Sequence, residues 1–148
     1  LKVIHMIKDP RALVFSMVKP WLPYGAHRVV RYTGRWIVEN MIMRYLCQRA
    51  FVPAQVRGQT YESFASQPGE TLRAIGEWLG VEYAPERVSK FREYENFAIS
   101  GNMMRWREND DRIRLDQRWR KQLPIVYRKF VSWSTRPFHA YCGHAEAA

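Results

Sequence analysis

Residues 3–16 read VIHMIKDPRALVFS, and this stretch decides how the chain begins to fold. Its apolar start, Val3 to Ile7, is typical of a buried strand. Asp9 and Pro10 then suit the N-cap and the first position of a helix. Lys8 therefore lies where the strand ends and the helix begins. Because backbone N–H groups and the helix dipole favour an anion at such a junction, we expect a phosphate to bind there.

Further motifs follow in a fixed order along the chain. They are Tyr61-Glu62-Ser63-Phe64 before Pro68, TLRAIGEWLG over residues 71–80, ISGNMMRW over residues 99–106, and Leu115-Asp116 with Trp119 and Leu123. Together with Lys8-Asp9-Pro10-Arg11 and Ser16, this order resembles the sulfotransferases that use 3′-phosphoadenosine 5′-phosphosulfate (PAPS). The chain departs from the family pattern at Lys8, where Arg is usual, at Ser63, where Asp is usual, and at Met103, where Pro is common.

The resemblance implies an α/β fold, a three-layer parallel sheet of the P-loop-kinase-like sulfotransferase type. The family's Gly/Ser/Thr-rich 5′-phosphosulfate loop does not occur in the sequence. We therefore expect residues 1–148 to be the largely helical C-terminal part of a single sulfotransferase domain, with the remaining strands and the catalytic base upstream.

The function implied is transfer of a sulfuryl group from PAPS, as co-substrate, to an acceptor hydroxyl or amine, with a carbohydrate among the candidates. This chain would supply the half of the site that binds the 3′-phosphate, and alone it would be inactive. The alternative is a non-catalytic fragment or homologue that binds a nucleotide or an anionic glycan. A nucleic-acid-binding domain ranks behind both.

The resemblance also assigns cofactor-binding residues. Lys8 and Ser16 match the family's 3′-phosphate ligands, and Tyr61 matches a tyrosine close to the adenine. Gly101, Asn102 and Arg105 match a loop near the nucleotide, whose arginine could reach the phosphate in a forked geometry. The structural alternatives are a solvated lysine, a serine bonded to its own helix, a core tyrosine and a charged solvent loop. No catalytic residue is assigned, since the four histidines, His5, His27, His139 and His144, match no catalytic position and are read as structural.

Charge and composition narrow the partners without identifying one. The 24 Lys and Arg residues exceed the 14 Asp and Glu residues, which gives a net charge of +10 and indicates an anionic partner. Acidic residues interrupt the basic run over 112–121, which argues against nucleic acid. Cys47 and Cys142 are too few for a disulfide framework or a metal site and are read as free thiols, with one bridge left open in a lumenal protein. No apolar run could span a bilayer, although a membrane anchor upstream stays open. The resemblance places animal members in the Golgi lumen and bacterial members in the cytoplasm.

Periodicity and turn signals predict the remaining elements. We expect helices from about Thr33 to Ala50, from Pro68 to a stop at Gly80, over 85–91, from a cap at Asp116 to Leu123, and from Pro124 to Ser134, with a strand over 54–57, a loop over 92–114 and a last turn over 137–141. The long helix should carry an apolar stripe of Ile37, Val38, Met41, Ile42, Tyr45 and Leu46. Alternating strands and helices indicate a parallel sheet whose ligands lie at the carboxyl ends of the strands.

The acceptor pocket is expected near Trp21 to Arg35.

Overall fold

The computed structural model describes residues 1–18, 25–84 and 115–142, with side chains up to residue 139. It divides into two compact units, one formed by Leu1–Ser63 with Leu115–Ala148 and the other by Phe64–Arg114. The described part is mostly helical with one small parallel sheet, so it belongs to the α/β class. The sequence prediction of that class is confirmed.

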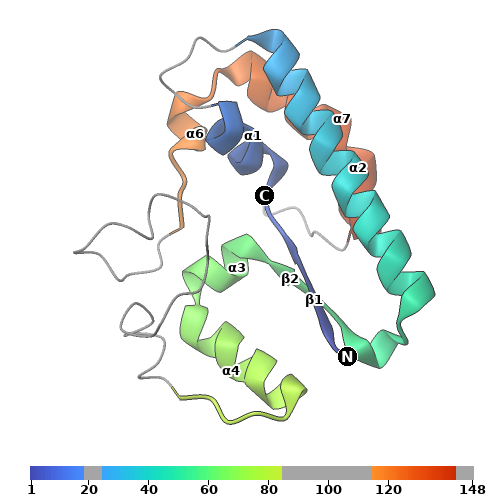
Figure 1. The fold of residues 1–148 in the computed structure, drawn as a ribbon. Coiled ribbons are helices and arrows are strands. Elements are labelled where there is room, and N and C mark those ends of the chain that lie inside the picture. The colour runs from blue at the N-terminus through green and yellow to red at the C-terminus, as the bar shows by residue number, and fades with distance from the viewer. Residues whose placement is uncertain (19–24, 85–114, 143–148) are drawn as a thin grey trace, which may run out of the picture. The chain divides into compact units, whose positions relative to one another are not determined.

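The sheet of the first unit has two strands, β1 (Val3–Ile7) and β2 (Val56–Thr60). They pair in parallel with Ile7 opposite Thr60, so both strands end at the same edge (Figure 1). Helix α2 (Ala26–Ala50) covers the face that carries His5 and Ile7, as His5 bonds to a side chain of α2 and Ile7 packs against it. The residues that follow the two strands, Lys8 and Tyr61, are therefore neighbours.

The core of the first unit lies between three helices, α1 (Pro10–Val18), α2 and α7 (Ile125–Cys142), which contact one another (Figure 1). Its centre is built from four valines that are at most 1% exposed: Val14, Val18, Val29 and Val131. A second cluster, in which Ala12 and Phe15 meet Trp119 and Leu123, attaches the short helix α6 (Trp119–Gln122) to α1.

In the second unit, the structure describes the end of α3 (Tyr61–Ser66), α4 (Pro68–Leu79) and the residues up to Ala84. Pro68 occupies the first turn of α4, and Gly80 ends the helix in a left-handed conformation with φ 78°. The amide of Gly80 donates to the Gly76 carbonyl at 2.8 Å. Start and stop both agree with the sequence, because Pro fits a first turn and Gly tolerates positive φ.

Near the sheet, the predicted start of the long helix and both predicted ends of the second strand are wrong. Helix α2 begins at Ala26, well before Thr33, because Val29 and Thr33 are buried and extend its inward face. The second strand is Val56–Thr60 rather than 54–57, because Pro53 starts a short 3₁₀ helix, η1 (Pro53–Gln55). Glycine and glutamine have low strand propensity, so the sequence VRGQT does not predict a strand over its full length. Pairing with β1 overrides that low propensity.

Two boundaries near the C-terminus also differ from the prediction. Helix α6 begins at Trp119 rather than directly after Asp116. The Asp116 carboxylate accepts a hydrogen bond from the Arg118 amide at 3.0 Å, just before the helix. Helix α7 continues through Pro137 instead of ending at Ser134. Its last turns are held by Phe138, which packs against the Ile7 and Trp36 cluster, and by His139, which is buried against Trp36. The predicted helix over 85–91 and loop over 92–114 lie outside the described residues.

The apolar stripe predicted on the long helix is not its buried face. Five of its members are 39–54% exposed: Val38, Met41, Ile42, Tyr45 and Leu46. The inward face instead carries Val29, Thr33, Trp36 and Cys47. Cys47 is a buried free thiol. No helix in the described ranges is long and apolar enough to cross a membrane.

Candidate functional site

Asp9 organises the junction between β1 and α1. Its Oδ1 accepts hydrogen bonds from the backbone amides of Arg11 (2.7 Å) and Ala12 (3.4 Å), as an N-cap should. The Arg11 guanidinium closes a fork on the same carboxylate, with Nε 3.1 Å from Oδ1 and Nη2 2.7 Å from Oδ2. Burial alone would raise the pKa of Asp9, but these hydrogen bonds and the Arg11 charge lower it overall. Asp9 is therefore ionised at neutral pH.

The structure brings together two of the residues assigned to the nucleotide. The Nζ of Lys8 lies 4.8 Å from the centroid of the Tyr61 ring, within the range of a cation–π contact. They meet because β1 and β2 end side by side, with Ile7 opposite Thr60. An adenine stacked on Tyr61 would have to use the opposite face of the ring or displace the ammonium group.

Glu62 lies at the same edge of the sheet, in the first turn of α3 just after β2. Its Oε1 accepts a hydrogen bond from the Asp9 amide at 2.9 Å. Its Oε2 is buried and has no hydrogen-bond partner within the part of the chain that the structure describes. The bond from the Asp9 amide to Glu62 therefore joins the start of α1 to the start of α3, and the second carboxylate oxygen of Glu62 makes no hydrogen bond within the described residues.

Asp116 brings a further negative charge to this edge. A fork from Arg118, with Nε at 2.9 Å and Nη2 at 2.7 Å, lowers the pKa of Asp116, and the Lys8 charge adds to the effect. Burial first, then the charges of Asp116 and Glu62, raise the pKa of Tyr61. The phenol therefore stays protonated at neutral pH and can donate a hydrogen bond.

The start of α1 offers an anion fewer amides than the sequence suggested. Pro10 has no N–H group, and the amides of Asp9, Arg11 and Ala12 already donate to carboxylates. A phosphate at this junction would have to bind mainly through side chains such as that of Lys8. The amides on which that expectation depends already donate to Asp9 and Glu62, and phosphate binding at this junction stays a prediction.

Ser16 lies on α1 about 9 Å beyond Pro10 along the helix axis, at 1.5 Å per residue. Its side chain is exposed, and its hydroxyl donates to the Leu13 carbonyl at 2.8 Å, which is the local bond expected of a helix serine. The hydroxyl oxygen can still accept a hydrogen bond. A role in phosphate binding stays a prediction.

The other predicted residues are separate from this edge. Gly101, Asn102 and Arg105 lie outside the described residues, as does His144. His5 bonds to Asn40 (3.2 Å), and burial above all lowers its pKa below 6.5. His139 is buried 3.0 Å from the Thr135 hydroxyl, and His27 is exposed on α2. In the described ranges, no group of three or more His, Cys, Asp or Glu residues could hold a metal ion.

Sequence reasoning missed Glu62 and Asp116 as parts of the edge. Placing the second strand at 54–57 left Glu62 several residues past the strand end, whereas the strand ends just before Tyr61. The sequence predicts Asp116 as a helix cap within the closing motif and gives it no place beside Lys8. One signal could have marked it, since Asp116-Gln117-Arg118 repeats the Asp-x-Arg spacing of Asp9-Pro10-Arg11, and both pairs form a forked ion pair at the start of a helix.

No protein-family model, curated protein or solved structure matches this chain.

Proposed function

We propose that this chain contributes the 3′-phosphate half of a PAPS-dependent sulfotransferase site, in a P-loop-kinase-like sulfotransferase fold. The observation that carries the proposal is the meeting of Lys8 and Tyr61. Both were assigned to the nucleotide from their motifs, they are far apart in sequence, and the parallel pairing of β1 and β2 makes them neighbours. Ligand binding at the carboxyl ends of parallel strands is common in α/β proteins.

The residues of the edge suit one half of a nucleotide. The Lys8 ammonium can neutralise a phosphate, and the protonated Tyr61 hydroxyl can donate to a phosphate or ribose oxygen. In the reaction, the acceptor oxygen or nitrogen bonds to sulfur while the bond from sulfur to the 5′-phosphate oxygen breaks. The acceptor proton passes to a base, a role for which no residue is assigned here. Lys8 and Tyr61 would hold the donor in line with the acceptor, which is the main protein contribution to group transfer of this kind.

A second candidate function is nucleotide or anionic-glycan binding without transfer. It requires neither the 5′-phosphosulfate loop, which does not occur in residues 1–148, nor a catalytic base, for which no residue is assigned. Both candidate functions include binding of a nucleotide or another anion, and only the first includes sulfuryl transfer.

An assay of sulfuryl transfer distinguishes the two candidate functions. The protein expressed from its complete reading frame would be incubated with radiolabelled PAPS and a panel of glycans, phenols and sterols. We expect acceptor-dependent transfer that falls at least about tenfold in Lys8→Ala, because a charge-assisted contact is worth about 1.5–3 kcal/mol.

The matched control is Lys121→Ala, which removes an exposed cation from α6. It should transfer like the parent. Binding of 3′,5′-adenosine bisphosphate without transfer to any acceptor would select the second candidate. Absence of both binding and transfer would overturn the proposal.

A further inference from the structure

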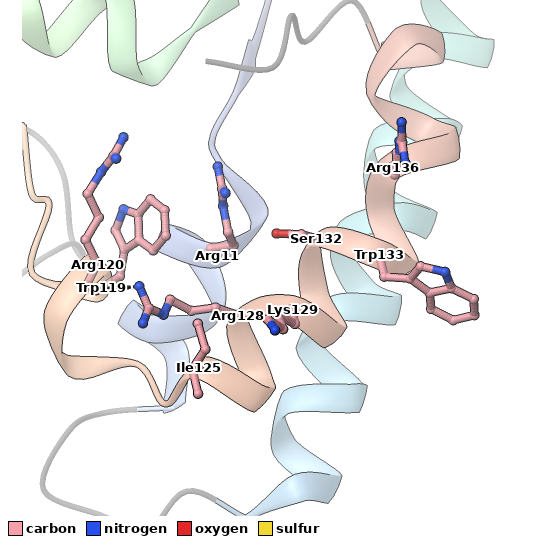
Figure 2. A pocket seen from close by; sticks show the side chains of 9 residues that line it. All are labelled: Arg11, Trp119, Arg120, Ile125, Arg128, Lys129, Ser132, Trp133 and Arg136. Carbon is pink, nitrogen blue, oxygen red and sulfur yellow. Dashed lines mark hydrogen bonds between the residues drawn. The ribbon is translucent and has the colours of Figure 1, made fainter. Parts of the chain in front are cut away.

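A basic pocket of about 610 Å³ opens between α1, α6 and α7 in the first unit. Figure 2 shows the nine side chains that line it: Arg11, Trp119, Arg120, Ile125, Arg128, Lys129, Ser132, Trp133 and Arg136. Its volume lies within the 300–1,000 Å³ typical of small-molecule sites. Lys8, Tyr61 and Ser16 do not line it, and Arg11, which also pairs with Asp9, is the residue that it shares with the edge of the sheet.

Five of the lining residues are cationic and none is acidic. Within the described part of the chain, only Arg11 among the five has an ion-pair partner, the Asp9 carboxylate. In Figure 2 the side chains of Arg11, Arg120 and Arg136 extend toward the same side of the view. Like charges held together destabilise an empty site, so this arrangement favours an anionic ligand with several charges.

Trp119 holds two of these cations in place. The Arg11 guanidinium lies 4.5 Å from the Trp119 ring and that of Arg120 lies 5.1 Å from it. The indole is 7% exposed, so little of it is open to a nucleobase or a sugar ring. It acts instead as a support that fixes the guanidinium groups.

The other indole does not add a stacking surface inside the pocket. Trp133 is 77% exposed, and Figure 2 shows its ring pointing away from the other side chains. Recognition in the pocket would therefore depend on charge and hydrogen bonding rather than on base stacking. That balance disfavours single-stranded nucleic acid, for which stacking on aromatic rings is a main contribution.

Arg128 gives the pocket a fixed wall. Its Nη1 donates to the Arg120 carbonyl at 2.6 Å, which ties α7 to α6. Its Nε is buried and has no hydrogen-bond partner in the described ranges. A buried donor without an acceptor is costly, and because this nitrogen is closed to solvent it adds no contact for a ligand.

We propose that this pocket binds a compact polyanion that carries several sulfate or phosphate groups. The proposal goes beyond the sulfotransferase function and does not rest on it. Sulfate and phosphate esters share the chemistry that the guanidinium groups recognise, and the test separates them.

The test measures binding to sucrose octasulfate and to inositol hexakisphosphate by calorimetry. The test variant Lys129→Ala/Arg136→Ala removes one Lys and one Arg from the pocket. The control Arg31→Ala/Lys121→Ala removes the same charges from exposed positions outside it. We expect the test variant to lose at least about tenfold in affinity and the control to lose little, because only the first pair faces the ligand. The probe that binds more tightly shows whether the pocket prefers sulfate or phosphate groups.

Ser132→Asp provides a second variant that keeps all five cations. Its added carboxylate should weaken both probes, while circular dichroism confirms that α7 stays helical. Equal losses of affinity in the two double variants would overturn the proposal, because they would show that binding depends on the net charge of the protein and not on the pocket. Duplex DNA that binds more tightly than both probes, with equal losses in both double variants, would overturn it in favour of a nucleic-acid surface.

Discussion

Asp9 shows how one side chain both builds the candidate site and limits it. Its carboxylate caps α1, pairs with Arg11 and occupies the amides that a phosphate would otherwise use. The capping role could be predicted from sequence, since Asp before Pro is a strong helix start. The bond from the Asp9 amide to Glu62 could not, because it depends on where β2 ends.

The pKa of Asp9 predicts a pH-dependent stability. The folded pKa lies below the ordinary value of 3.8, so the unfolded chain binds the proton more tightly. The stabilisation is therefore complete above pH 4 or so and is lost as the pH falls through the folded pKa. Asp9→Asn should destabilise the protein at pH 7 by about 1–2 kcal/mol, through a weaker cap and a lost ion pair.

Thermal melts of both proteins at pH 7 and at several lower values check this prediction. The difference between parent and Asp9→Asn should shrink as the pH falls below 3.8. A difference that stays constant down to pH 2 would contradict it.

At the scale of elements, α2 positions the end of β1. The Trp36 indole Nε1 donates to the Lys8 carbonyl at 2.8 Å, and the ring packs on Ile7. Sequence patterns predicted β1, α1 and α4 well, because caps, Pro and Gly act locally. They failed on the buried face of α2, because Thr33 and Trp36 point inward and a more apolar stripe stays exposed. Which face packs depends on distant partners such as Val14 and Val131.

Trp36→Phe tests this coupling between elements. It keeps an aromatic ring and removes the donor to Lys8, so a partly buried carbonyl loses its partner and stability should fall by about 1–3 kcal/mol. The control Trp133→Phe changes a ring that is 77% exposed and should stay within about 0.5 kcal/mol of the parent. Chemical denaturation at pH 7 measures both. Equal effects would show that the Trp36 bond contributes nothing.

At the scale of the molecule, the described sheet is small for an α/β protein. Ile4 and Met6 are 37% and 46% exposed on the sheet face opposite His5, whereas parallel sheets are normally covered on both faces. The class could be predicted from alternating strands and helices. The pocket between α1, α6 and α7 could not, because its cations come from segments that only the tertiary structure brings together.

The central claim is that Lys8, at the carboxyl edge of β1 and β2, binds a nucleotide 3′-phosphate. Calorimetry on the parent, Lys8→Ala and Ser16→Ala, with 3′,5′-adenosine bisphosphate and with 5′-AMP, tests it most directly. We predict that each variant loses about ten- to a hundredfold in affinity for the bisphosphate, and that neither differs from the parent with 5′-AMP. The Lys121→Ala control should match the parent with both ligands. Unchanged affinity of both variants for the bisphosphate would contradict the claim.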